Sequence, residues 1–61
     1  MKARARVEID LISNAQRIFK FNLDGQGYDD IENQVQEFSQ HKKDKYAGKI
    51  KTLSWEVSFL D

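Results

Sequence analysis

The chain has 61 residues, which is enough for one small domain and too few for two. It contains no cysteine, so neither a disulfide framework nor a thiolate zinc site can support the fold. Ten lysine and arginine residues balance ten aspartate and glutamate residues, and the zero net charge argues against strong, indiscriminate attraction to nucleic acid or to an anionic membrane.

The composition is that of a folding chain, because 39% of the residues are hydrophobic and 11% are aromatic. Met1 is followed by no apolar leader, and no segment is long and apolar enough to span a bilayer. We therefore expect a complete cytoplasmic protein.

Residues 2–12 alternate between apolar and charged side chains, which predicts a β-strand with one buried face. Turn-forming residues follow at 13–15, and alternation resumes over 16–23, where Phe19, Phe21 and Leu23 share a face. Two strands separated by so short a break predict an antiparallel hairpin.

The apolar period then lengthens to three and four residues, which predicts a helix over 29–46. Asp29 and Glu32 match an acidic capping box at the start of this helix. Acidic residues at its start and lysines at its end suit the helix dipole, and Gly48 is a natural stop.

Alternation returns over 51–60 and predicts a third strand. The fold class is therefore α+β: a single β-β-α-β domain, 1–61, with a three-stranded, mainly antiparallel sheet and one helix packed on one face. The third strand can lie antiparallel beside the first, giving the order 2-1-3, or parallel beside the second. We favour 2-1-3 because the small Ala3 and Ala5 then lie under the helix between larger neighbours.

The apolar faces of these elements define the predicted core, which has little margin of stability at this chain length. The core residues are Val7, Ile9, Leu11, Phe19, Phe21, Leu23, Ile31, Val35, Phe38, Leu53, Trp55, Val57 and Phe59.

The residues that carry chemistry do not form a catalytic pattern. His41 follows Glu37 by four residues, a spacing that stabilises a helix, and no further metal ligand or base accompanies the pair. The acidic residues over 24–32 lack the ligand ladder of a calcium loop, and Gly25-Gln26-Gly27 lacks the remaining residues of a phosphate loop. We expect a protein that is not an enzyme and that binds no cofactor or metal.

Nucleic-acid binding is the alternative function. Lys2, Arg4 and Arg6 line the solvent face of the first strand, Lys20 lies beside them on the second, and a sheet face can enter a DNA groove. However, acidic residues share this face, and no aromatic residue offers a base-stacking platform there.

Protein binding is the preferred function. Residues 24–37 carry five acids and no base, whereas 42–51 carry five lysines and one aspartate, and such a dipolar surface can orient a charged partner. In size and composition the chain is similar to the small accessory proteins of phages and mobile elements, which occupy a surface of a host protein and thereby regulate or inhibit it. The candidate binding residues lie on the polar side of the helix: Asp29, Asp30, Gln36, Glu37, Gln40 and Asp44.

Two states of association stay open, a monomer and a weak homodimer. The order 2-1-3 leaves strands two and three as edges, and neither contains a proline that would block another strand. Ile18 and Leu60 add apolar area to the open face of the sheet, so a dimer could form through an edge or through this face.

Overall fold

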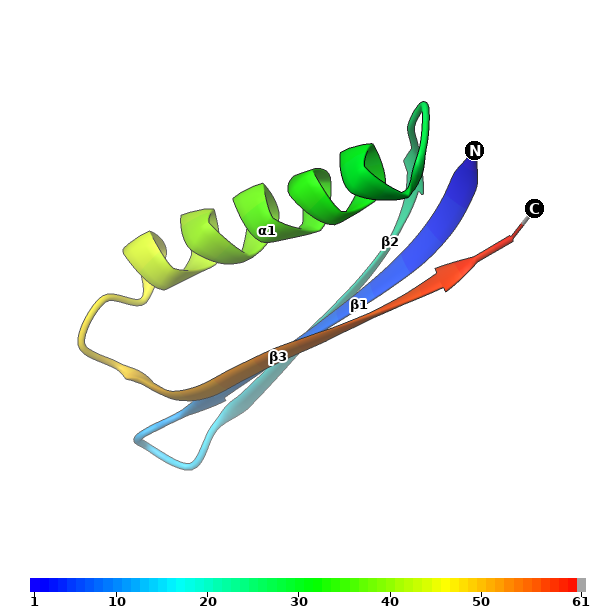
Figure 1. The fold of residues 1–61 in the computed structure, drawn as a ribbon. Helices are drawn as coiled ribbons and strands as arrows, with labels where there is room; N and C mark the ends of the chain where they lie inside the picture. The colour runs from blue at the N-terminus through cyan, green and yellow to red at the C-terminus, as the bar shows by residue number, and fades with distance from the viewer. Residues whose placement is uncertain (61) are drawn as a thin grey trace.

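A computed structural model of the chain describes residues 1–60. The elements follow in the order β1 (Lys2–Leu11), β2 (Gln16–Asp24), α1 (Tyr28–Lys45) and β3 (Ile50–Phe59), and α1 lies across one face of the sheet (Figure 1). Each boundary falls within one residue of its predicted position.

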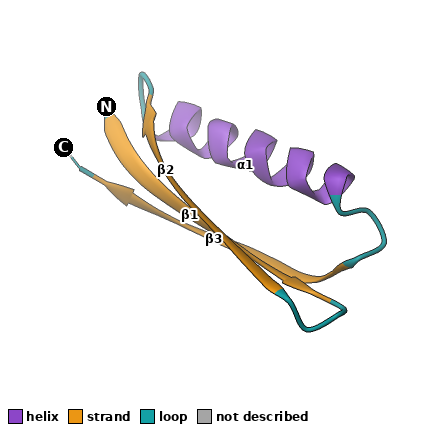
Figure 2. Ribbon diagram, turned by 180° about the vertical axis from the view of Figure 1, so that it is seen from behind, coloured by secondary structure: helices purple, strands orange, loops and turns teal. Residues whose placement is uncertain are grey.

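The sheet has the order β2-β1-β3, and β1 pairs antiparallel with both neighbours. This confirms the predicted fold class and the favoured strand order. The register places Val7 between Phe19 of β2 and Trp55 of β3. A β-bulge interrupts the β1–β3 pairing beyond Asp10, and the strands twist strongly as they pass beneath the helix (Figure 2).

The core lies between β1 and α1 because the helix runs over the middle of the sheet and covers its central strand most completely. On the β2 side, Phe38 extends the core: its ring lies 4.5 Å from that of Phe21 and 5.7 Å from that of Phe19, centroid to centroid. The fully or almost fully buried apolar residues are Ala3, Ala5, Val7, Ile9, Leu11, Ile31 and Val35.

Two residues of the predicted core are exposed instead. Trp55 is 41% exposed and Phe59 is 38% exposed, although the register places both on the face of the sheet that carries the helix. Both lie on an edge strand, and no strand within residues 1–60 covers their outer side. The inward aromatic side chains of the other edge strand, β2, are half-buried, because Phe38 and Lys42 of the helix contact them, whereas on β3 the helix residue Tyr28 contacts Phe59.

The start of the helix also differs from the prediction: Asp29 and Glu32 do not form the predicted capping box. The N-cap residue is Gly27, and no side chain caps it. Asp30 instead turns back to the preceding loop, where its Oδ2 accepts a hydrogen bond from the Gln26 backbone N–H at 3.0 Å. A Cβ on Gly25 would lie 2.6 Å from this oxygen, so a larger residue there would displace the Asp30 carboxylate from its hydrogen bond.

The end of the helix agrees better with the prediction. The Tyr46 backbone N–H donates to the Lys42 carbonyl at 2.9 Å and closes the last turn. Two residues later Gly48 adopts a φ of 77°, in the left-handed region that favours glycine, and the chain turns into β3.

Candidate functional site

The face of the sheet opposite the helix carries a basic corner, which we define as Lys2, Arg4, Arg6 and Lys20. The pairing register brings these residues to one end of the face, with Arg6 directly opposite Lys20. Arg4 donates from Nε to the Asn22 side-chain oxygen at 3.4 Å. Arg4, Lys20 and Asn22 line a surface depression of about 290 Å³. The structure thus gathers the residues predicted for the alternative function.

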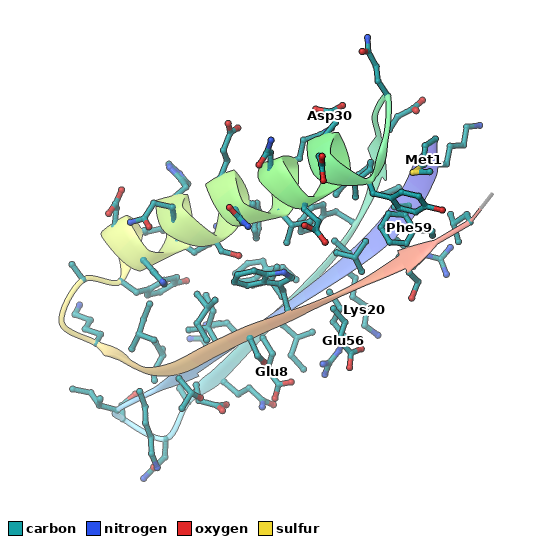
Figure 3. The ribbon with its side chains drawn as sticks, viewed as in Figure 1. Met1, Glu8, Lys20, Asp30, Glu56 and Phe59 are labelled. Atoms are coloured by element: carbon teal, nitrogen blue, oxygen red, sulfur yellow. The ribbon has the colours of Figure 1, made fainter. Side chains whose placement is uncertain are left out.

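Acidic residues reduce the positive potential of this corner. Arg6 forms an ion pair with Glu8, with 2.9 Å between Nη1 and Oε2, and Glu56 of β3 lies opposite Arg6 in the register. Figure 3 shows Glu8, Lys20 and Glu56 on the same side of the sheet, away from the helix. A phosphate backbone laid across this face would meet both signs of charge.

The other end of the open face is a hydrogen-bonded polar network beside the β1–β2 turn. The Asp10 carboxylate accepts from the Thr52 hydroxyl at 2.9 Å and from the Gln16 amide at 3.0 Å, and the Gln16 amide also donates to Glu8. Asp10 and Thr52 line a depression of about 350 Å³. Through these hydrogen bonds Asp10 of β1 is linked to Gln16 of β2 and to Thr52 of β3, so the network ties β1 to both neighbouring strands.

The polar side of the helix holds the residues predicted to bind a partner. Gln36, Glu37 and Gln40 line a depression of about 340 Å³, and the Gln40 amide donates to Asp44 Oδ1 at 3.2 Å. Asp29 lies exposed in the first turn. Asp30 is bonded to the loop before the helix and thus serves the fold. The structure therefore groups most of this set along the helix and assigns one member a structural contact.

A third surface was not predicted from the sequence. We call it the aromatic strip and define it as Tyr28, Trp55 and Phe59, which are 59%, 41% and 38% exposed. The Tyr28 and Phe59 rings pack edge to face with their centroids 4.6 Å apart. Trp55 precedes Phe59 by four residues, which is two strand repeats or about 13 Å. The strip therefore follows the helix side of β3.

The strip lies along a sheet edge. Within residues 1–60, β3 pairs with β1 on one side and with no strand on the other, so its outer row of backbone N–H and C=O groups faces solvent. Its side chains bring just two charges, Lys51 and Glu56, to a strand of ten residues. An edge of this kind is open to another strand.

The β2 edge is better protected. The aromatic side chains of β2 are half-buried, and the Lys42 ammonium lies 4.5 Å from the centre of the Phe19 ring. Arg17, Lys20 and Asp24 distribute charge along the strand. The two edges therefore differ, and β3 is the edge that combines exposed aromatic area with few charges.

Among residues 1–60, no three His, Cys, Asp or Glu side chains are grouped so that they could hold a metal ion. Over the same residues, the structure contains no helix with the length and apolar character needed to cross a membrane. His41 is exposed on the helix.

Comparisons of the chain with models of protein families, with curated proteins and with solved structures found no match.

Proposed function

We propose that this chain is a non-enzymatic module that binds a protein partner through the β3 edge and its aromatic strip. The observation that carries the proposal is the exposure of Tyr28, Trp55 and Phe59 beside an unpaired strand edge. Tryptophan and tyrosine are among the residues that most often dominate the energy of protein interfaces, since they bury a large area with few rotatable bonds.

The mode of binding follows from this geometry. An extended segment of the partner adds to β3 as a fourth strand, its backbone groups pair with the outer row of β3, and its apolar side chains cover Trp55 and Phe59. The polar side of the helix faces away from this edge and keeps the complex in solution. Such a module acts by occupying a surface of its partner in the cytoplasm, and regulation or inhibition of that partner is the consequence.

Affinity capture tests the proposal. Three tagged baits are compared in lysate of the source cells: the natural chain, a strip variant with Trp55→Ser and Phe59→Ser, and a helix variant with Gln36→Ala and Gln40→Ala. Thermal melts of each bait establish that it is folded. A partner that the natural chain and the helix variant retain, and that the strip variant loses, supports the proposal.

Titration of the purified partner against the same three proteins measures how much each variant changes the affinity for the partner. We expect the strip variant to bind at least about tenfold more weakly, as for loss of an interface anchor. Equal affinity of the natural chain and the strip variant would overturn the proposed surface, and selective loss with the helix variant would move the site to the helix.

The second candidate function is nucleic-acid binding by the basic corner, which the pairing of Arg6 with Lys20 brings together. The Arg6–Glu8 ion pair and the nearby Glu56 argue against it. A salt series on unselected duplex DNA and RNA decides the matter, with Arg4→Gln plus Lys20→Gln as the corner variant and Lys43→Gln plus Lys45→Gln as its control. Micromolar binding that falls steeply with salt and needs the corner would establish this function in place of the first.

A further inference from the structure

The β3 edge has the properties of a strand that can pair with a copy of itself. Its pairing with β1 is regular from Thr52 to Phe59, beyond the bulge, so no bulge interrupts the row of backbone groups with which another strand would pair. The segment carries one charge, Glu56, and two exposed aromatic side chains on the helix side. The chain contains no proline that would interrupt pairing at this edge.

We infer that a second copy of this chain pairs antiparallel with β3, on a two-fold axis that passes through Trp55. The two three-stranded sheets then join into one sheet of six strands, with both helices on the same face. This inference concerns the edge named in the proposed function but does not depend on it, because no other protein takes part. One strand edge pairs with one strand at a time, so a second copy and the partner of the proposed function compete for β3.

The register follows from two conditions. Residues directly opposite each other in an antiparallel pair lie on the same face of the sheet, so a two-fold axis has to pass through a residue and not between residues. Within the regular segment from Thr52 to Phe59, two registers of this kind pair seven residues of each copy: one has its axis at Trp55 and the other at Glu56. The register at Glu56 places two carboxylates directly opposite each other, which is unfavourable. The register at Trp55 is therefore the one we infer.

The register at Trp55 produces a favourable set of cross-strand neighbours. Trp55 lies opposite Trp55 of the second copy, and Leu53 lies opposite Val57 twice, once on each side of the axis. On the other face Ser54 lies opposite Glu56, so each carboxylate meets a small polar side chain. The exposed area of Trp55 is thereby covered by an equivalent ring.

Charge along the edge favours this antiparallel arrangement. The start of β3 carries Lys51, with Lys49 just before it, whereas Glu56 is the charge of its second half. Antiparallel pairing turns the basic start of one copy toward the acidic half of the other. Lys51 then lies three positions along the edge from the residue opposite Glu56 of the second copy, about 10 Å away, so this attraction is weak and adds to the side-chain pairing without deciding it.

The open face offers no comparable surface. Ile18 is paired opposite Glu8, whereas the Leu60 backbone N–H donates to the Lys2 carbonyl at the other end of β1. Six positions of β1, about 20 Å, separate these two side chains. They form two isolated apolar sites and not one patch that a second copy could cover.

Trp55 is the sole tryptophan of the chain, so its fluorescence reports directly on whether the side chain at the proposed two-fold axis becomes buried. As the protein is concentrated, we expect the emission to shift to shorter wavelength while the sedimentation mass rises from 7.2 kDa toward twice that value. Trp55→Lys should abolish the rise in mass, and Ile18→Lys, on the open face, should leave it unchanged. A constant mass near 7.2 kDa up to millimolar concentration would overturn the dimer, without touching the proposed partner binding.

The register has its own test, because the chain has no cysteine. Ser54→Cys and Glu56→Cys each keep Trp55 in place, and both positions are exposed. In the proposed register the two variants mixed together form a mixed disulfide faster than either forms one alone, and mass spectrometry separates the three products. Faster cross-linking of Ser54→Cys alone or of Glu56→Cys alone would overturn the axis at Trp55. Cross-linking no faster than that of Gln36→Cys on the helix would overturn pairing through β3.

Discussion

The ring of Tyr28, the first residue of the helix, packs edge to face against the ring of Phe59, the last residue of β3, with 82° between their planes. Residues 31 positions apart in the sequence thus meet where the helix begins and the sheet ends. The contact holds the start of the helix over the β3 edge and orients two of the three side chains in the aromatic strip.

A double-mutant cycle measures this contact. Urea unfolding of Tyr28→Ala, Phe59→Ala and the double variant should give a coupling free energy of about 0.5–1.5 kcal/mol, as for other aromatic pairs in contact. Tyr28→Ala combined with Phe19→Ala is the control, because Phe19 lies on the opposite edge strand and should couple to Tyr28 by less than about 0.5 kcal/mol. Independent effects of Tyr28 and Phe59 would show that their rings do not pack in solution.

The two large aromatic residues of the predicted core should differ in their effect on stability. Phe38→Ala should lower the free energy of unfolding by about 2–4 kcal/mol, because Phe38 packs on Phe19 and Phe21. Trp55→Ala should cost less, about 1–2 kcal/mol, since its side chain is already partly in water. Gln36→Ala, on the exposed side of the helix, should change stability by less than about 0.5 kcal/mol. Urea unfolding orders the three variants, and a loss for Trp55→Ala equal to that for Phe38→Ala would contradict the exposed position of Trp55.

The turn after the helix depends on a glycine. Gly48→Ala should destabilise the chain by about 1–2 kcal/mol, because a φ of 77° brings a Cβ close to the following carbonyl. Gly27→Ala is the control, since Gly27 is extended at φ −172° and a Cβ there would meet nothing within 4 Å beyond its own chain neighbours. Thermal melts compare the two, and a Gly48→Ala melt no lower than that of Gly27→Ala would refute the left-handed turn.

Asp29 and Asp30 offer a matched pair at the start of the helix. Both stand in the first turn and interact with the helix dipole, but Asp30 also accepts the hydrogen bond from the Gln26 backbone. Asp30→Ala should therefore cost about 1 kcal/mol more than Asp29→Ala. Amide hydrogen exchange at Gln26 should also accelerate in Asp30→Ala and not in Asp29→Ala; equal rates would mean that the bond does not form in solution.

The sequence alone determined the elements and their order. The alternation of residues 2–12 and the three- and four-residue spacing of the helix have different periods, and these periods reflect the local geometry of strand and helix. The small Ala3 and Ala5 also indicated the central strand, because a helix packs closely over small side chains and both residues are fully buried. The polar side of the helix follows from the same period.

The tertiary structure decided which faces are covered. Alternation shows that Trp55 and Val7 point to the same side of the sheet, but it does not show that the helix buries Val7 and leaves Trp55 partly in water. That difference depends on where one helix rests across three strands, and Phe38 and Lys42 extend over β2. The same holds for Asp30, whose partner in the loop is set by the path of the chain from β2 into the helix. The β3 edge is a candidate interface for this physical reason: a single helix covers the central strand most completely and leaves Trp55 and Phe59 at the β3 edge partly exposed.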